Sequence, residues 1–374
     1  MKFLLVAGYS ESLTNFRGPL IEALIASGQE VHAAAPGLCE HPEVVAKLLA
    51  KGVRIHSVSM NRTGMNPWHD LKTLLCLYRL MRQIRPERVL GYTIKPVIYG
   101  SLAAWLARVP ERYALVTGLG YAFAGESGQR TLLRRIATRL YQVALHFTHR
   151  VFFQNPDDRD LFVQRGILSA ADKTVVVNGS GIDISIFSPM PLPAQPAFLL
   201  IARLLGDKGV REYVTAARLV HQQYPQCKFR LAGWIDDAPD AIAQAELDSW
   251  IQDGVIEFLG RLKDVRPAIA DSTIYVLPSY REGTPRTVLE AMAMARAVIT
   301  TDAPGCRETV IPGVNGLLVP IKSAEALAQA MLDLVRDRQQ VEAMGQQGRR
   351  IAEQKYDVQK VNQQMLTTMG IFNK

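Results

Sequence analysis

Two glutamates stand eight residues apart in the segment REGTPRTVLE, residues 281–290. An ionised carboxylate accepts hydrogen bonds from neighbouring hydroxyl groups, so Glu282 and Glu290 are candidates to hold a polyol. Gly283 lies between them and lets the backbone approach a ligand closely, and the free amides at the start of a following helix favour an anion such as phosphate. A ligand with both a polyol and a phosphate part is a nucleotide sugar.

The segment is expected to be a strand-to-helix turn. IYVLPS before it has the composition of a buried strand, and we expect Thr284 as the N-cap and Pro285 as the first helical residue. The residues also allow a plainer interpretation, in which Glu282 pairs with a nearby arginine at the surface and Glu290 is a solvated helix residue. Both interpretations stay open on these residues alone.

A second turn of this kind lies in AFLLIARLLGDKGVREYV, where Arg203 and Lys208 follow a strand. Two fixed cations at a strand end can neutralise a diphosphate leaving group in place of a metal ion, arginine by planar contacts and lysine as a compact charge. The alternative is that Lys208 is an ordinary exposed residue beside Asp207.

Both turns need parallel sheets to position them. Short apolar runs alternate with segments of helical period along the whole chain, which is typical of an α/β fold with helices on both faces of each sheet. Four prolines within residues 189–196 mark the expected linker between two domains. Ligands of such sheets bind at the carboxyl ends of the strands, which we expect to face each other across a cleft.

The charge is uneven between the two halves of the chain. Residues 1–187 hold 22 Lys and Arg against 14 Asp and Glu, whereas residues 188–374 are neutral. The first half is therefore expected to meet an anionic partner. No window of about 18 apolar residues is present, so any membrane contact is expected to be peripheral. The four scattered cysteines suggest neither a zinc cluster nor a disulfide framework.

Several ordered blocks resemble one enzyme family. LIARLLGDKG, FLGRLKDV and the long segment from REGTPRTVLE to NGLLVP are similar to the donor half of retaining glycosyltransferases of family 4, which have the GT-B fold of two Rossmann-like domains. The resemblance implies an acceptor-binding domain at 1–187, with a C-terminal helix at 357–374 crossing back to it, and a donor-binding domain at 188–356. It also implies a metal-independent, retaining hexosyltransferase that uses no cofactor.

The resemblance assigns roles to residues. The catalytic residues would be Arg203, Lys208 and Glu282, with the two cations on the departing phosphate and Glu282 on the transferred sugar. Glu290 would hold the ribose. The other implied donor-binding residues are Gly8, Gly260, Arg261, Gly283, Thr284, Pro285 and Val288.

Two loops of the first half are candidates for the acceptor. GYSESLTNFRG holds Asn15 and Arg17, and Arg17 is either a phosphate ligand or a solvated helix residue. VTGLGYAFAG holds Thr117, Gly118 and Gly120 as candidate acceptor-loop residues. A nicotinamide site is rejected in the second loop, because its glycine pattern is incomplete and the acidic ribose ligand is absent.

NRTGMNPWHDL and VTGLGYAF look most like the subgroup that extends undecaprenyl-diphosphate-linked sugars, including N-acetylgalactosaminyltransferases acting on lipid-linked bacillosamine. The implied reaction moves an N-acetylhexosamine such as GalNAc from a UDP-sugar to a lipid-linked saccharide, at the cytoplasmic face of a bacterial membrane. A basic amphipathic helix is expected near 129–147, either lying on anionic lipid or packing its apolar stripe on the sheet with its arginines in water. Its arginines are Arg130, Arg134, Arg135 and Arg139, and its apolar residues include Ile136 and Val143.

Other functions stay open. A transferase with a lipopolysaccharide or capsule acceptor, or a UDP-sugar epimerase of the same fold, would share the donor residues. Nucleic-acid binding lacks an aromatic RNA-binding motif. Asp158 and Asp160 formally match the D-x-D of metal-dependent transferases, but Asn155-Pro156 before them predicts a capped helix start. No metal is expected, and His32, His56 and His69 are expected to be structural.

Overall fold

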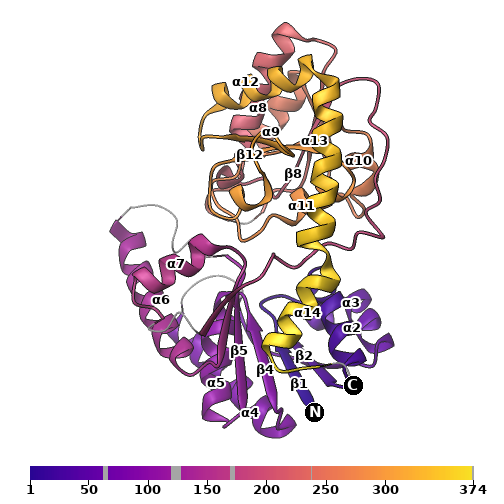
Figure 1. Cartoon of the computed structure of the whole chain (residues 1–374). Helices are drawn as coiled ribbons and strands as arrows, with labels where there is room; N and C mark the ends of the chain where they lie inside the picture. The colour runs from indigo at the N-terminus through magenta and orange to yellow at the C-terminus, as the bar shows by residue number, and fades with distance from the viewer. Residues whose placement is uncertain (62–65, 119–127, 169–172, 237, 373–374) are drawn as a thin grey trace. The chain divides into compact units, whose positions relative to one another are not determined.

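The computed structural model describes residues 1–61, 66–118, 128–168, 173–236 and 238–372, of which 128–134 are described by their backbone only. The chain divides into two compact units, unit 1 formed by Met1–Ser180 with Val361–Lys374 and unit 2 formed by Gly181–Lys360. Each is a parallel sheet between helices (Figure 1). The predicted α/β class, with two Rossmann-like domains, is confirmed.

In unit 1 every described strand pairing is parallel, and the order β3-β2-β1-β4-β5-β6-β7 reverses direction beside β1, as in doubly wound sheets. The strands are β1 (Lys2–Val6), β2 (Glu30–Ala35), β3 (Arg54–Ser57), β4 (Arg88–Tyr92), β5 (Glu111–Val116), β6 (Arg150–Phe153) and β7 (Thr174–Val176). The helices are α1 (Glu11–Asn15), α2 (Gly18–Ala26), α3 (Pro42–Ala50), α4 (Pro67–Ile84), α5 (Ser101–Leu106), α6 (Gly128–His146), α7 (Pro156–Gln164) and α14 (Val358–Thr368).

Alternate residues of β1 point to opposite faces of this sheet and begin two separate cores. Phe3 and Leu5 pack with α2, α3 and α14, whereas Leu4 and Val6 pack with α4 and α5. Figure 1 shows α14, near the yellow end of the chain, beside α2 and α3. The chain's last helix therefore completes the core of its first domain.

Unit 2 has the strand order β10-β9-β8-β11-β12-β13, again with parallel pairings throughout its described strands. The strands are β8 (Ala197–Ile201), β9 (Lys228–Ala232), β10 (Ile256–Gly260), β11 (Ile274–Leu277), β12 (Ala297–Thr301) and β13 (Gly316–Val319). The helices are α8 (Val210–Gln223), α9 (Gln244–Gln252), α10 (Arg266–Ala270), α11 (Arg286–Ala293), α12 (Ala324–Arg336) and α13 (Arg338–Ile351). Because β8 and β11 are neighbours, the turns that follow them share one edge of the sheet.

The proline-rich stretch belongs to unit 2 and follows the boundary at Gly181. Arg296 is fully buried and donates hydrogen bonds to the carbonyl oxygens of Met190 and Pro191. Arg338 donates likewise to those of Leu192 and Pro193. Because prolines have no backbone N–H, this stretch cannot pair as a regular strand, and its carbonyl oxygens need other donors. Arginines of unit 2 supply them.

The helix predicted near 129–147 exists as α6. Ala137, Tyr141 and Leu145 are buried against the sheet, whereas Ile136 and Val143 are exposed. Arg135 and Arg139 are exposed, and the side chains of Arg130 and Arg134 lie outside the description. No helix in the described part of the chain combines the length and apolarity needed to cross a bilayer.

Candidate active site

Lys208 and Glu282 meet at the carboxyl edge of the unit 2 sheet. The Nζ atom of Lys208 donates a hydrogen bond of 2.6 Å to Oε1 of Glu282, and the two side chains are 13% and 18% exposed. Burial disfavours the ammonium ion, but the carboxylates of Glu282 and Asp207 raise the pKa of Lys208 above its ordinary value. Lys208 is therefore a fixed cation, and its description as an ordinary exposed residue is wrong.

The backbones of the two turns are locked together. Gly209 has a φ of 69°, and a Cβ atom there would lie 2.1 Å from the carbonyl oxygen of Pro278, so only glycine allows this approach. The amide of Tyr280 donates a hydrogen bond of 2.8 Å to the carbonyl oxygen of Asp207. The amide of Glu282 donates one of 2.9 Å to Pro304. These contacts hold the glutamate turn from both sides.

Glu290 lies on the inner side of α11 and is almost fully buried. Arg286, one turn earlier, donates a hydrogen bond of 2.9 Å from Nε to Oε1 of Glu290. Burial raises the pKa of Glu290, and Arg286 only partly offsets this. The alternative that Glu290 is a solvated helix residue is therefore wrong.

The remaining residues of the glutamate turn flank this pair. Gly283 and Pro285 are buried, and Thr284 is half-buried. Helix α11 begins at Arg286 with Pro285 as its N-cap, one residue later than predicted. The side chain of Val288 belongs to the core of unit 2, and its amide donates to the carbonyl oxygen of Pro285. The side chain of Val288 is therefore part of the core, and its donor-binding role stays a prediction.

Arg203 follows β8 and is held by an acid that the sequence did not single out. Its Nη1 atom donates a hydrogen bond of 2.6 Å to Oδ2 of Asp236, in the turn after β9. Its charge opposes protonation of Lys208, although Glu282 and Asp207 outweigh it. The two predicted cations therefore lie on one edge of the sheet, each with a carboxylate partner.

Gly260 and Arg261 end β10 at the same edge. Gly260 has a φ of 66°, and its carbonyl oxygen accepts a hydrogen bond of 2.9 Å from the amide of Gly233. The guanidinium of Arg261 stacks 4.6 Å from the ring centroid of Trp234. Trp234 was missed in the sequence, although an aromatic residue directly after a strand of the donor half was a usable signal. Together they form a flat surface suited to a planar ring.

In unit 1 a polar pocket of about 610 Å³ opens at the carboxyl ends of β1, β2 and β3. Gly8 lines it, together with Ser10, Glu11, Glu40 and Asn61. Hydroxyl, carboxylate and amide groups of this kind suit a saccharide. Thr117 and Gly118 follow β5, which β4 separates from β1, and Gly120 lies outside the described residues.

Arg17 and Asn15 do not line that pocket. Arg17 is buried at the N-cap of α2, with its guanidinium 5.2 Å from the ring centroid of Tyr92, so the solvated alternative is wrong. Asn15 is exposed at the end of α1.

The helix start predicted at Asn155-Pro156 is confirmed, because Oδ1 of Asn155 accepts a hydrogen bond of 2.7 Å from the amide of Asp158. Among the residues that the structure describes, no three His, Cys, Asp or Glu side chains gather as a metal site requires.

Two family models match this chain. The model of glycosyl transferases group 1 matches residues 195–337, and that of the glycosyl transferase 4-like domain matches residues 16–179. The chain belongs to this glycosyltransferase family. The first match covers both turns of the candidate site, and the second covers most of unit 1.

Relatives of the transferase are similar along most of their length. It is 28% identical, over 87% of each chain, to the N,N'-diacetylbacillosaminyl-diphospho-undecaprenol alpha-1,3-N-acetylgalactosaminyltransferase of Campylobacter jejuni. It is 22% identical, over 80% of each chain, to the UDP-Gal:alpha-D-GlcNAc-diphosphoundecaprenol alpha-1,3-galactosyltransferase of Escherichia coli. The solved structure of HepE from Anabaena in complex with UDP aligns over the whole of both chains, with a TM-score of 0.78 and 20% identity. The transferase thus has the GT-B fold.

Proposed function

We propose that this transferase moves an N-acetylhexosamine, GalNAc in the first instance, from a UDP-sugar to an undecaprenyl-diphosphate-linked saccharide in bacterial glycan assembly. The observation that carries the proposal is the contact of Lys208 with Glu282 beside the buried Glu290. The choice of donor and acceptor is supported by the similarity to the Campylobacter jejuni enzyme over 87% of both chains.

Lys208 and Arg203 stabilise the departing UDP in this mechanism. The bond between C1 of the sugar and the diphosphate oxygen breaks, and its electron pair passes to that oxygen. Fixed cations in the turn after β8 lower the barrier, because they are oriented before the charge develops. They do the work that a divalent metal does elsewhere, so we expect turnover in the presence of EDTA.

Glu282 exchanges partners when the donor binds. In the structure its Oε1 atom accepts a hydrogen bond from Lys208. A diphosphate draws the lysine toward itself, and the carboxylate then accepts hydrogen bonds from the hydroxyl groups of the sugar. Glu290 holds the ribose, and the backbone at Gly260 and Arg261 meets the uracil ring.

The acceptor occupies unit 1 in this proposal, where Glu40 and Asn61 line the polar pocket. Its hydroxyl attacks C1 from the face that UDP leaves, and its proton passes to the departing diphosphate. The configuration at C1 is therefore retained, and no protein base is needed on that side. A lipid-linked acceptor puts the enzyme at the cytoplasmic surface of a membrane, which the basic residues of unit 1 favour.

The proposal is tested by incubating the pure protein with UDP-GalNAc, UDP-GlcNAc, UDP-galactose and UDP-glucose, each with short prenyl-diphosphate-linked saccharides. Mass spectrometry should detect one added N-acetylhexosamine with UDP-GalNAc, with EDTA present or absent. Product with a different sugar would overturn the donor assignment alone. Absence of product from every pair would overturn the proposal, and epimerised donor in reactions without acceptor would identify the epimerase alternative.

A further inference from the structure

Helix α4 carries an exposed row of large apolar side chains. Its inner residues, Leu77 and Met81 among them, pack against β1 and β4. On the outer side Trp68 is 75% exposed, Leu71 45% and Leu75 44%. Their spacing of three and four residues places them on one face of the helix. A tryptophan with two leucines in water is an unusual outer surface for a helix that already has a full inner face.

The same outer side of α4 is cationic. Lys72, Arg79 and Arg82 are exposed, and none forms an ion pair or hydrogen bond with a described residue. Asp70, the helix's one acid in the printed sequence, is buried and accepts a hydrogen bond of 2.8 Å from Lys95. The outer side of α4 therefore offers apolar groups and positive charge with no negative charge.

This absence of partners contrasts with the surface helices of unit 2. There Arg211 pairs with Glu246 on α9, and Arg218 pairs with Asp253 directly after it. The sequence explains the difference, because residues 51–150 hold 16 Lys and Arg but only 4 Asp and Glu. The whole positive excess of the chain therefore lies in the segment that contains α4, α5 and α6.

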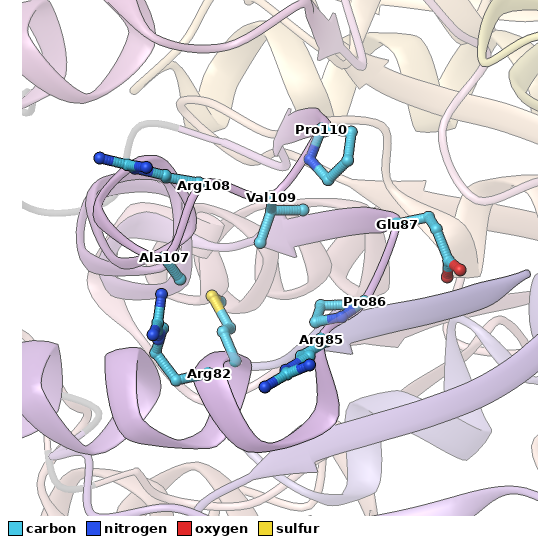
Figure 2. Close-up of a pocket in the computed structure, with 9 residues that line it drawn as sticks. Arg82, Arg85, Pro86, Glu87, Ala107, Arg108, Val109 and Pro110 are labelled. Carbon is cyan, nitrogen blue, oxygen red and sulfur yellow. The ribbon is translucent and has the colours of Figure 1, made fainter.

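A basic pocket of about 390 Å³ lies at the C-terminal end of α4 (Figure 2). Arg82 and Arg85 line it from α4 and its C-cap, and Arg108 lines it from the turn after α5. In Figure 2 the side chains of Arg82 and Arg85 lie below, Arg108 extends at the upper left, and Glu87 extends at the right. The carboxylate of Glu87 already accepts a hydrogen bond of 2.5 Å from the backbone amide of Lys2. Three arginines without a described acidic partner suit a phosphate group.

We propose that the outer side of α4, with this pocket, is the surface by which the protein binds a bilayer of anionic phospholipid. In this proposal Trp68, Leu71 and Leu75 lie at the level of the lipid headgroups and first acyl carbons. The transfer of tryptophan and leucine side chains from water to that level has a favourable free energy. The cations lie against lipid phosphates, and the arginine pocket holds one headgroup. A membrane fits both features together, because it presents an apolar layer directly beneath an anionic one. The proposal rests on the proposed function only for the need to reach a lipid-linked acceptor.

The apolar row is tested with the triple variant Trp68→Gln/Leu71→Gln/Leu75→Gln of the full-length protein. These side chains are exposed, so the variant should keep the melting temperature of the wild type. Co-sedimentation with vesicles of phosphatidylglycerol and phosphatidylcholine should fall roughly tenfold or more. Ile251→Gln, at a 42% exposed position on α9 of unit 2, is the control and should bind as the wild type does. Equal binding of the triple variant and the wild type would overturn the proposal.

The charge is tested with Arg82→Gln/Arg85→Gln against Lys228→Gln/Arg350→Gln, which removes two exposed cations from unit 2. Each cation near an anionic leaflet contributes about fivefold in partition, so the first variant should bind roughly 30-fold more weakly and the control should be unchanged. Binding should also fall with added salt and on vesicles of phosphatidylcholine alone. Equal losses in both double variants would show a general charge effect and overturn the surface assignment. If inorganic phosphate competes for the pocket but the first variant still binds vesicles as the wild type does, the pocket would be assigned to a free anion instead.

Activity separates this surface from the proposed function. The triple variant should transfer sugar to a water-soluble short-prenyl acceptor at the wild-type rate, but more slowly to the same saccharide on a long prenyl chain in vesicles. Vesicle binding through α4 without transfer to either acceptor would support the assigned surface and overturn the proposed function. Normal transfer, together with vesicle binding that the α4 variants do not change, would support the proposed function and overturn the assigned surface.

Discussion

Lys208 is the residue on which the proposed chemistry depends most. It is held by Glu282 from the turn after β11 and by the charge of Asp207 beside it, and both favour the ammonium form. An amine kept charged in a mostly buried place stabilises a developing negative charge better than a solvated one, because little water screens it. The same contact keeps Glu282 oriented until the donor arrives.

Replacing Lys208 with Met should lower kcat/KM by about 10²- to 10³-fold, because the departing diphosphate loses a preorganised cation. Lys263→Met, an exposed position in the turn after β10, should lower it far less. Steady-state kinetics with the donor and acceptor found by the screen provide the measurement. Retention of more than about a third of the wild-type kcat/KM by Lys208→Met would remove this residue from the mechanism.

Glu290 should make UDP binding depend on pH. Burial raises its pKa, so its carboxylate takes up a proton at a higher pH than an exposed glutamate does. A protonated carboxyl accepts ribose hydroxyl hydrogen bonds less well, and affinity for UDP should therefore fall as the pH is lowered toward the acidic range.

Calorimetric titration at several pH values checks the dependence on Glu290. Glu290→Gln should bind UDP more weakly at neutral pH and show a flatter pH profile, and 2′,3′-dideoxy-UDP should show the flatter profile with the wild-type protein. An unchanged profile in the variant would place the ribose elsewhere.

At the scale of elements, neighbouring strands decide which side chains meet. The turns after β8 and β11 are joined through Gly209 and Asp207 because these strands pair directly. The edge of the other sheet has its own pair, in which Nδ1 of His32 on β2 lies 2.9 Å from Nε2 of His56 on β3. The rings stack in parallel with centroids 5.1 Å apart, as expected of structural histidines.

The histidine pair should make unit 1 less stable in mild acid. Burial lowers the pKa of both His32 and His56, and Arg54 lowers both further. As the pH falls below about 6.5, the unfolded chain binds protons before the folded one, so stability declines until the folded pKa values are passed. Urea unfolding between pH 7.5 and 5 should show this decline. His56→Gln should reduce the decline in stability, and the control His41→Gln, outside this pair, should leave it unchanged. An equal decline in all three proteins would contradict the assignment.

At the scale of the whole molecule, unit 1 is completed by a distant part of the chain. Helix α14 returns to unit 1 and buries Met365, Leu366 and Met369 against the residues of β1, α2 and α3. The carbonyl oxygen of Met369 accepts a hydrogen bond of 3.2 Å from the hydroxyl of Tyr113 on β5. The stability of the first domain therefore depends on the last residues of the chain.

Met365→Ala should destabilise unit 1 by about 2–4 kcal/mol, because it leaves a cavity at a fully buried position. Gln363→Ala, on the exposed side of α14, should change stability by no more than about 0.5 kcal/mol. Urea unfolding followed by hydrogen exchange of unit 1 and unit 2 peptides checks where the loss occurs. Loss confined to unit 2 peptides would contradict the docking of α14 on unit 1.

The sequence by itself determined the local features of this protein. Alternating apolar runs and helical segments predicted the two parallel sheets, because fully buried strands and amphipathic helices have different periods. Spacing and residue type also singled out Glu282, Glu290 and Lys208, because their chemistry belongs to short turns beside strands. The resemblance carried by these turns predicted the family correctly.

Only the tertiary structure decided the partners of those residues. Lys208 and Glu282 lie 74 positions apart, and they meet because β8 and β11 are adjacent in a sheet whose strand order no local pattern encodes. The stacking of Arg261 on Trp234 has the same origin. Only packing against the sheet showed that Trp68 on α4 and Ile136 on α6 remain exposed, because one sheet face can bury only one side of each helix.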